Sequence, residues 1–184
     1  MPNPKPANRV RIIGGKFRSR MLGFPSAVGL RPTPDRVRET LFNWLGQDLH
    51  GWSCLDLFAG SGALGFEAAS RGAARVVMIE RERAAFDALL HNRDLLGASD
   101  VEIQRADALN WLAAHPETFD LIFVDPPFDS EQAERTLALL APHLKPSGQV
   151  YVEKRGFVDA PQGFAIHRSG RAGQSHFALL IKET

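Results

Sequence analysis

The chain has 184 residues, 44% of them hydrophobic, and a formal net charge of +1. This length suffices for one well-buried domain and is short for two. No run of about 18 apolar residues is present to span a bilayer, and the first residues lack the apolar core of a secretory signal. These features argue against a membrane protein and a secreted protein, and they predict a cytoplasmic location.

The cysteine and histidine content bears on redox and metal chemistry. Cys54, the single cysteine, lies in the apolar run "WSCLDLF" and has no partner for an internal disulfide. We expect it to pack in a strand rather than to act as a nucleophile. None of the six histidines has a partner at metal-ligand spacing. The sequence therefore predicts no metal site.

The N-terminal segment is strongly basic. Residues 1–38 hold nine Lys and Arg residues and one acidic residue, whereas the remainder holds thirteen basic and twenty acidic residues. The basic residues are interleaved in "VRIIGGKFRSRML", where two short alternating segments flank Gly14-Gly15, a pair typical of a two-residue hairpin turn. We expect an ordered basic hairpin that binds phosphates, although a solubilising arm would have the same composition. Residues 1–32 are predicted to extend one globular domain, residues 33–184.

A helix start signal follows in "RPTPDRVRETLFNWLG". Thr33 is positioned to cap the helix, Pro34 falls at the first helical position, and Asp35 places negative charge in the first turn. The apolar residues at helical spacing should face the core, and they are Val37, Leu41, Trp44 and Leu45. Another face carries Arg36, Thr40 and Asn43, and it is either a solvated helix surface or one wall of a cleft.

From residue 52 onward, short apolar runs alternate with helical patterns. The runs are "WSCLDLF", "ARVVMIE", "VEIQRA", "FDLIFVD" and "GQVYVEK", and helices are expected near 63–71, 82–96, 108–114 and 130–142. Such strands, separated by amphipathic helices, predict an α/β fold with a mostly parallel sheet covered on both faces. The stretches "FAIHRS" and "HFALLIKE" predict a terminal antiparallel hairpin, which brings the sheet to seven strands.

Two motifs follow strands of this sheet, whose ligands should bind beyond the carboxyl ends of the strands. "DLFAGSGALG" contains Gly60-x-Gly62-x-x-Gly65, the glycine spacing of a dinucleotide-binding turn. Asp56 argues against a dinucleotide, because a carboxylate repels phosphate and favours a cationic or amino-bearing ligand. The second motif is "DPPF", residues 125–128, in which two prolines stiffen the chain and remove two backbone donors.

Together these motifs resemble those of S-adenosylmethionine-dependent methyltransferases that modify exocyclic or amide nitrogens. The order of "RIIGGKFRSRML", "RPTPDRVRETLFNWL" and "DLFAGSGALGFEAASRGA" is more specific. With these segments, the chain closely resembles the bacterial 16S ribosomal RNA guanine-N2 methyltransferases of the RsmD family, from residue 9 to its end. The resemblance implies a Rossmann-like class I methyltransferase fold, S-adenosylmethionine as the cofactor, and the guanine conventionally numbered 966 as the acceptor.

The resemblance also implies which residues bind the cofactor. Asp56 and the turn after it would hold the methionine end, Glu80 the ribose hydroxyls, and Asp107 the adenine amino group. Asp107 could also cap the helix that follows it, and the two roles are compatible. The expected cofactor contacts are Asp56, Phe58, Ala59, Gly60, Ser61, Gly62, Glu80, Arg81, Asp107 and Ala108.

The "DPPF" motif would carry the reaction, through Asp125, Pro126, Pro127 and Phe128. Asp125 and the Pro126 carbonyl would accept hydrogen bonds from the target amine, and Phe128 would stack on a base turned out of its helix. Methyl transfer would then depend mainly on positioning. The candidate RNA contacts are Lys16, Arg18, Arg20, Arg31, Thr33, Arg36 and Asn43.

Three functions remain open from the sequence. The first is a monomeric enzyme acting on 16S rRNA, either naked or within a partly assembled small subunit. The second is a methyltransferase of the same motif class that acts on adenine in DNA or RNA, or on protein glutamine. It would keep every cofactor contact and differ only in the acceptor. The third is a non-catalytic nucleic-acid-binding module on the same fold, which the intact "DPPF" disfavours.

Overall fold

The computed structural model describes residues 8–26, 31–127 and 130–184. The elements along the chain are β1 (Asn8–Arg11), β2 (Met21–Phe24), α1 (Asp35–Trp44), β3 (Ser53–Asp56), α2 (Ala63–Ser70), β4 (Arg75–Glu80), α3 (Arg83–Leu96), β5 (Val101–Arg105), α4 (Ala108–Ala114), β6 (Phe119–Val124), α5 (Ser130–Leu137), η1 (Ala141–His143), β7 (Leu144–Arg155), β8 (Phe164–Ala172) and β9 (Ser175–Lys182). Within the described ranges, no helix has the length and apolarity needed to cross a membrane.

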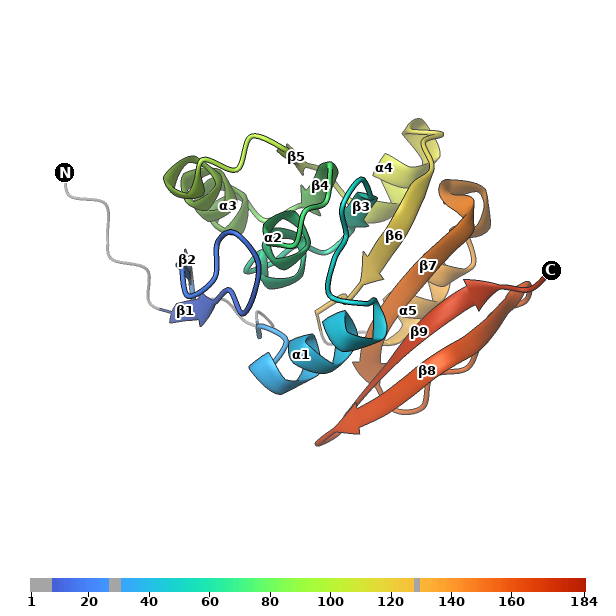
Figure 1. Cartoon of the computed structure of the whole chain (residues 1–184). Helices are drawn as coiled ribbons and strands as arrows, with labels where there is room; N and C mark the ends of the chain where they lie inside the picture. Colours follow the sequence, from blue (N-terminus) through green and yellow to red (C-terminus); the bar gives the residue numbers. More distant parts are fainter. Residues whose placement is uncertain (1–7, 27–30, 128–129) are drawn as a thin grey trace.

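A seven-stranded sheet runs through the described part of the chain, in the order β5-β4-β3-β6-β7-β9-β8 (Figure 1). Strands β3 to β7 are parallel, and β9 pairs antiparallel with both β7 and β8. The strand order reverses between β3 and β6, because the chain builds outward from β3 to β5 and then returns to the other side of β3. Open α/β sheets bind their ligands at such a reversal, beyond the carboxyl ends of the strands.

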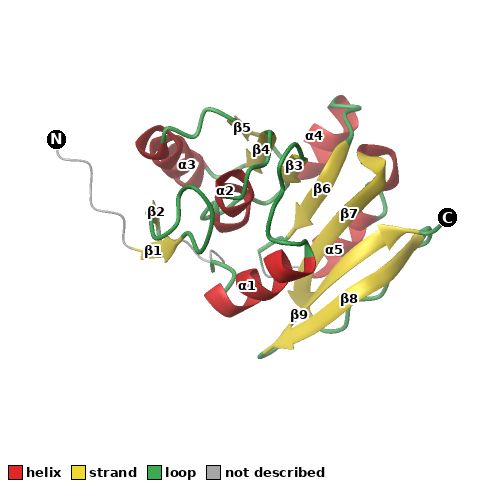
Figure 2. Ribbon diagram, viewed as in Figure 1, coloured by secondary structure: helices red, strands yellow, loops and turns green. Residues whose placement is uncertain are grey.

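Helices cover both faces of this sheet (Figure 2). The core on one face includes α1 and α2, and the core on the other includes α4 and α5. Because side chains alternate along a strand, Cys54 belongs to the first core and its neighbour Leu55 to the second. Burial raises the pKa of the Cys54 thiol, in keeping with the packing role predicted for it.

The predicted elements are all present, with shifted ends. The strand expected from residue 148 begins at residue 144, and the helix expected over 130–142 ends at residue 137. A short 3-10 helix, η1, takes the place of its last turn, because Pro142 lacks the backbone N–H that an α-helix would need there. The mostly parallel seven-stranded sheet confirms the predicted architecture.

The N-terminal hairpin differs from its prediction. Strands β1 and β2 pair, but residues 12–20 join them instead of a two-residue turn at Gly14-Gly15. The backbone N–H groups of Ile13 and Gly14 each donate to Glu67 of α2 at 2.9 Å. A Cβ at Gly15 would lie 1.9 Å from the Ser70 carbonyl oxygen, so this glycine allows a close approach to the helix. The prediction of a two-residue turn was wrong, because the contacts of Gly14 and Gly15 with α2 override the local turn signal.

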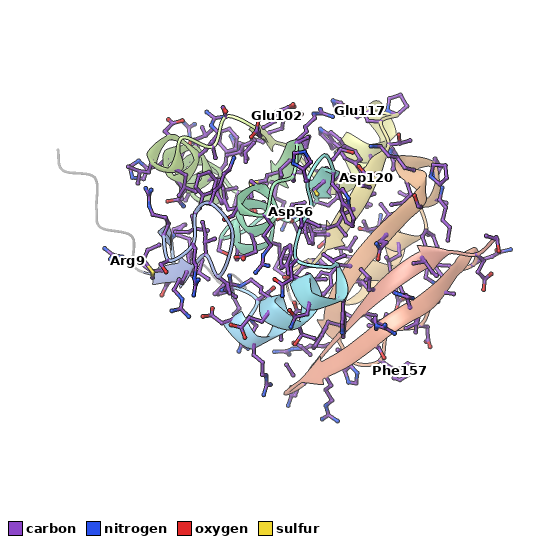
Figure 3. The ribbon with its side chains drawn as sticks, viewed as in Figure 1. Arg9, Asp56, Glu102, Glu117, Asp120 and Phe157 are labelled. Carbon is purple, nitrogen blue, oxygen red and sulfur yellow. The ribbon has the colours of Figure 1, made fainter. Side chains whose placement is uncertain are left out.

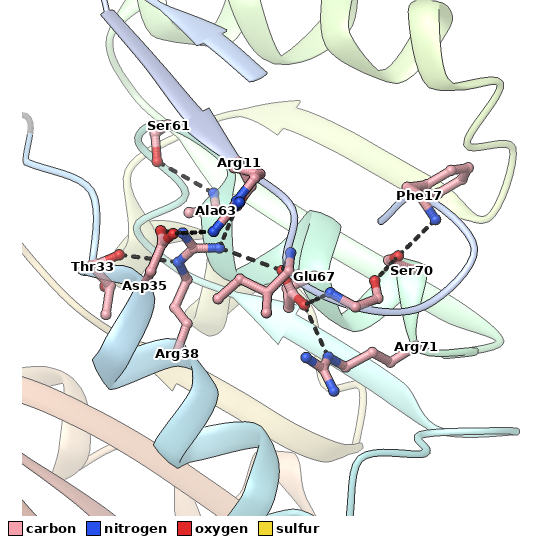
Figure 4. A network of polar contacts seen from close by, with 12 residues as sticks. Arg11, Phe17, Thr33, Asp35, Arg38, Ser61, Ala63, Glu67, Ser70 and Arg71 are labelled. Carbon is pink, nitrogen blue, oxygen red and sulfur yellow. Dashed lines mark hydrogen bonds and ion pairs between the residues drawn. The ribbon is translucent and has the colours of Figure 1, made fainter. Parts of the chain in front are cut away.

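Glu67 and Arg38 anchor this loop (Figure 4). Both side chains are fully buried, with Arg38 Nη1 3.4 Å from Glu67 Oε2. Arg38 also donates Nη1 to the Arg11 carbonyl oxygen at 2.8 Å and Nε to the Thr33 carbonyl oxygen at 3.0 Å. These contacts tie the hairpin to α1 and α2 and fix the backbone at Thr33. The division of the chain at residue 32 stays a prediction.

Candidate active site

A cleft of about 530 Å³ lies at the carboxyl ends of the parallel strands. The residues that follow or end β3, β4, β5 and β6 face it, and they include Gly60, Glu80, Asp107 and Asp125. The segment before α1 forms another wall. Within the described ranges, no group of three or more His, Cys, Asp and Glu side chains is placed to hold a metal ion.

Most of the predicted cofactor contacts meet in this cleft. Those that line it are Asp56, Phe58, Ala59, Gly60, Ser61, Glu80, Arg81, Asp107 and Ala108. Gly62 is not among the lining residues. It caps α2 in a left-handed conformation (φ +82°), and a Cβ there would meet the Phe66 ring at 2.6 Å. Gly62 therefore shapes the turn from behind.

Asp56 ends β3 in the interior of the molecule (Figure 3). The residue is 1% exposed, and neither carboxylate oxygen has a hydrogen-bond partner. Burial raises the pKa of Asp56 to about 7, while the N–H groups of Gly65 and Phe58 act in the opposite direction without reaching hydrogen-bond geometry. A buried unsatisfied acceptor costs about 1–3 kcal/mol. The carboxyl therefore fits a ligand that brings an amino group or a positive charge.

The turn after β3 fixes Glu80. Gly60 is left-handed (φ +54°), a conformation that favours glycine. Its N–H donates to Glu80 Oε2 at 2.8 Å, and the Glu82 N–H donates to Oε1 at 2.9 Å. Each carboxylate oxygen keeps a further lone pair. Glu80 is thus held at the end of β4 with acceptor capacity for two neighbouring hydroxyl groups.

Asp107 caps α4 and also lines the cleft. Its Oδ1 accepts a hydrogen bond from the Asn110 N–H at 3.1 Å, so the capping alternative considered from the sequence is present. No described residue donates to Oδ2. The cap therefore leaves one oxygen for a ligand amino group beside Ala108.

Asp125 follows β6 and faces the same cleft, with Pro126 buried beside it and Pro127 exposed. Although part of Asp125 remains accessible from the cleft, protein surrounds its side chain. Burial raises the pKa of Asp125 well above its ordinary value, and the nearby Glu153 raises it further. Phe128, the predicted stacking residue, lies outside the described residues.

Two residues near Asp125 were missed from the sequence. In the β6–β7 register Phe123 lies opposite Tyr151, and continuing it brings Asp125 beside Glu153. The Tyr151 hydroxyl donates to Glu153 Oε2 at 3.0 Å. The signal that could have found Glu153 is an acidic residue near the carboxyl end of the apolar strand "GQVYVEK".

The predicted cap by Thr33 was wrong. The helix begins at Asp35, so Pro34 is the N-cap residue rather than the first helical residue. No side chain caps α1. The Thr33 hydroxyl lies 3.0 Å from Asp125 Oδ2 and 3.1 Å from Glu153 Oε2. The Thr33 hydroxyl is thus hydrogen-bonded to two carboxyl groups instead of capping the helix N-terminus.

The candidate RNA contacts do not form one cluster. Arg31 and Thr33 line the cleft. A second hollow, of about 710 Å³, is lined in part by Lys16, Arg18 and Asn43. Asn43 lies near the C-terminal end of α1, which is the end away from the cleft. Its side-chain oxygen accepts a hydrogen bond from the Gln47 amide. Arg36 is exposed, and Arg20 Nη2 donates to the Leu95 carbonyl oxygen at 3.0 Å.

Comparisons with known proteins agree with this geometry. A family model described as "Conserved hypothetical protein 95" matches residues 10–181. The Escherichia coli K12 protein named Ribosomal RNA small subunit methyltransferase D is 42% identical over 187 residues, which span 99% of this chain and 94% of that protein. The chain belongs to the RsmD family. The family predicted from the sequence is confirmed.

Solved structures extend the comparison for this family member. A chain from Escherichia coli has a TM-score of 0.87 at 42% identity, covering 96% of this chain and 99% of that chain. A more distant methyltransferase-like chain, solved in complex with SAH, has a TM-score of 0.68 at 14% identity, covering 86% of this chain and 52% of that chain. The second likeness bears on the fold alone. The predicted class I methyltransferase fold is confirmed.

Proposed function

We propose that this RsmD family member transfers a methyl group from S-adenosylmethionine to the exocyclic N2 of a guanine in 16S rRNA, the guanine conventionally numbered 966. The name of its E. coli relative specifies methylation of small-subunit ribosomal RNA. The observation that carries the proposal is the pair Asp56 and Asp125, because both carboxyls line one cleft without a cationic partner among the described residues.

The cleft fits S-adenosylmethionine better than a dinucleotide. This cofactor has an amino group and a sulfonium but no phosphate, and when bound it supplies an electrophilic methyl group. Asp56, which has no partner of its own, would accept hydrogen bonds from the amino group. Glu80 would accept from the ribose hydroxyls and Asp107 Oδ2 from the adenine amino group. A pyrophosphate in the same place would be repelled by Asp56.

Asp125 and Pro126 would hold the acceptor amine. The lone pair of an exocyclic amine is delocalised into its ring, so the amine is a weak nucleophile. Hydrogen bonds from its two N–H groups to the Asp125 carboxylate and the Pro126 carbonyl would orient it and return electron density to nitrogen. Pro126 and Pro127 would keep that carbonyl fixed. Holding two reactants in a productive geometry supplies a large part of the rate enhancement that enzymes give to bimolecular reactions.

The protein would act as a monomer on RNA within a small ribosomal subunit or its precursor. Basic residues of the N-terminal segment would contact RNA phosphates, Arg31 at the cleft and the others on the surface beyond it, and these others are Lys16, Arg18, Arg20 and Arg36. Such contacts add affinity without sequence preference and weaken as salt rises.

Labelled methyl transfer tests this function. The purified protein is incubated with S-adenosylmethionine and either naked 16S rRNA or small subunits that lack the modification, and the nucleosides are analysed by mass spectrometry. We expect N2-methylguanosine, mapped to position 966 by primer extension. N6-methyladenosine or methylated ribosomal protein would overturn the acceptor but keep the cofactor site. An absence of S-adenosylmethionine binding in calorimetry would instead favour a non-catalytic module.

A further inference from the structure

Four polar side chains meet where β6, β7 and the start of α1 come together. Thr33 Oγ1 lies 3.0 Å from Asp125 Oδ2 and 3.1 Å from Glu153 Oε2, and the Tyr151 hydroxyl lies 3.0 Å from the same Glu153 oxygen. Thr33, Tyr151 and Glu153 are buried. The four residues therefore form a continuous hydrogen-bonded row from Tyr151 to Asp125, and its members Asp125, Thr33 and Glu153 line the cleft.

The row needs a proton beyond those of its hydroxyl groups. A threonine hydroxyl has one hydrogen and donates to one acceptor at a time. Between two ionised carboxylates, the Thr33 hydroxyl would donate a hydrogen bond to one. Its oxygen lone pairs would then face the negative charge of the other. The Tyr151 hydroxyl is already used by Glu153. Every contact is satisfied when one of the two carboxyls, Asp125 or Glu153, carries a proton.

The surroundings favour this shared proton. No described residue forms an ion pair with Asp125 or Glu153, and Arg31 acts on Glu153 only at longer range. Burial raises the pKa of both carboxyls, and the charge of Asp56 adds to the rise at Asp125. Two close carboxyl groups with little solvent lose their protons in separate steps, so an intermediate state with one proton spans a range of pH.

We infer that Asp125, Thr33 and Glu153 form one proton-sharing unit, in which Glu153 is a positioning residue and the outlet for the proton that the methylated amine releases. With the shared proton on Glu153, the donors run in one direction, from Tyr151 to Glu153, to Thr33 and to Asp125. Asp125 is then ionised, with Oδ1 directed to accept from the amine. This inference rests on the proposed function, because a proton is released only where an amine is methylated.

The proton balance closes over one turnover. Methylation leaves the acceptor nitrogen with a positive charge, one N–H bond breaks with its electron pair kept by nitrogen, and the proton bonds to Asp125. Glu153, which also lines the cleft, releases its own proton to water. A half-turn of the Asp125 carboxyl about its Cβ–Cγ bond places the protonated oxygen against Thr33, and Asp125 then gives its proton to the Thr33 oxygen as the Thr33 hydroxyl passes its hydrogen to Glu153. The unit returns to its starting state, and the net change is one proton from amine to solvent.

Glu153→Gln tests the inference, because glutamine keeps the size of the side chain and a polar end group but has no acid proton to share. We expect kcat to fall roughly tenfold, less than the roughly hundredfold or more of a group that exchanges a proton with the substrate directly, with the RNA KM and S-adenosylmethionine Kd within about twofold. Because glutamine cannot ionise, the step in which the unit loses its shared proton should also disappear from the basic limb of the pH–rate profile. Glu102→Gln, at the opposite edge of the sheet, is the matched control and should leave the profile unchanged.

Thr33 provides an independent arm. Thr33→Ser keeps the hydroxyl and should retain the wild-type profile. Thr33→Val should lower kcat about as much as Glu153→Gln does and move the acidic limb to higher pH, because the Thr33 hydrogen bond lowers the pKa of Asp125. The double variant should be no slower than either single variant, because both interrupt one unit. A uniform loss of rate with an unshifted profile in Glu153→Gln and Thr33→Val would indicate a structural role and overturn the inference.

Carboxyl NMR of the wild-type protein tests the shared proton without any turnover. The Asp125 and Glu153 signals should move together in two steps as pH changes. Independent single titrations at ordinary pKa values would refute the unit even if the variants fail to fold. If the wild-type protein methylates no amine while these signals remain coupled, the proposed function fails and the shared proton stands.

Discussion

The two edges of the central sheet hold their acidic side chains in opposite ways. At the amino ends of the parallel strands, carboxylates are paired with cations. Arg75 Nε lies 2.8 Å from Glu102 and its Nη1 2.6 Å from Glu117, and Lys145 Nζ lies 2.8 Å from Asp120. Figure 3 shows the three labelled carboxylates of this group at one edge of the sheet, apart from Asp56 in the interior.

At the carboxyl ends, three carboxyls of the cleft, Asp56, Asp125 and Glu153, have no such partners among the described residues. Neither oxygen of Asp56 has a hydrogen-bond donor, and no described cation pairs with Asp125 or Glu153. Burial raises the pKa of all three carboxyls. At the amino ends, by contrast, the Arg75 hydrogen bond lowers the pKa of Glu102.

Burial alone does not separate these two groups. Asp120 is partly desolvated, which raises its pKa, yet the hydrogen bonds from Lys145 and Ser53 outweigh that effect and lower it. Glu67 is fully buried, and it pairs with Arg38 and Arg71. What distinguishes the cleft is burial without a counter-charge. Such an arrangement costs stability, and it persists in proteins mainly where a ligand or a reaction uses the group.

The largest effect that would test this contrast is the pH dependence of stability through Asp56. Its pKa is about 7 in the folded protein against 3.8 when unperturbed, so the folded state binds the proton more tightly. Stability from this group is complete below pH 4 and is lost as pH rises through 7, by about 4 kcal/mol at 1.36 kcal/mol per unit. Thermal unfolding without cofactor should therefore show that the stability of Asp56→Asn rises relative to that of the wild-type protein as pH increases from 5 to 8. If the difference in stability between the two proteins stayed constant with pH, Asp56 would not be an unpaired buried carboxyl.

Removal of the Asp125 carboxyl gives the next largest effect. Asp125→Ala should lower kcat by roughly a hundredfold or more, within the range for an acid–base or orienting group, while S-adenosylmethionine affinity stays within a few-fold. Single-turnover methylation and calorimetry measure the two quantities. Asp120→Ala, on the same strand at the paired edge, should keep the wild-type rate. A large loss of cofactor binding in Asp125→Ala would make Asp125 structural.

A smaller effect is expected from the basic loop between β1 and β2. Arg18→Ala combined with Arg20→Ala should raise the RNA KM roughly tenfold near physiological salt, without changing cofactor affinity, and reduce the slope of log K against log salt by about two. Arg75→Gln with Lys145→Gln removes two charges from the amino edge and should leave the RNA KM unchanged. Equal activity of the loop variant at every salt concentration would refute the phosphate contacts.

The smallest effect belongs to the paired edge itself. Glu102→Gln breaks an ion pair with Arg75 whose side chains are 48% and 37% exposed. Exposed pairs contribute about 0–1 kcal/mol, so denaturant unfolding should shift by less than about 1 kcal/mol. Because the pKa of Glu102 is lowered, its contribution is present above pH 4.5 and is lost as pH falls. A shift as large as that of Asp56→Asn would remove the difference between the two edges.

Local patterns of the chain determined the fold class and much of the cleft. Apolar runs alternating with helical periodicity predicted the parallel sheet, and the glycine turn after Asp56 and the prolines after Asp125 predicted where ligands bind. The sheet is confirmed and residues of both motifs line one cleft, because strand alternation, turn conformation and the position of a residue at a strand end depend on neighbours in the sequence. Ligand binding in that cleft stays a prediction. The structure brings Glu80 and Asp107 to the same cleft for the same reason.

The tertiary structure alone decided which groups share hydrogen bonds. Thr33 reads as a helix cap in the sequence, yet its hydroxyl lies between Asp125 and Glu153, 92 and 120 residues away. Gly14-Gly15 reads as a hairpin turn, yet it is the place where a loop meets α2. A hydroxyl or a glycine has several local uses of similar free energy. The strand order and the helix packed nearby select among them, because burial makes each unpaired polar group costly.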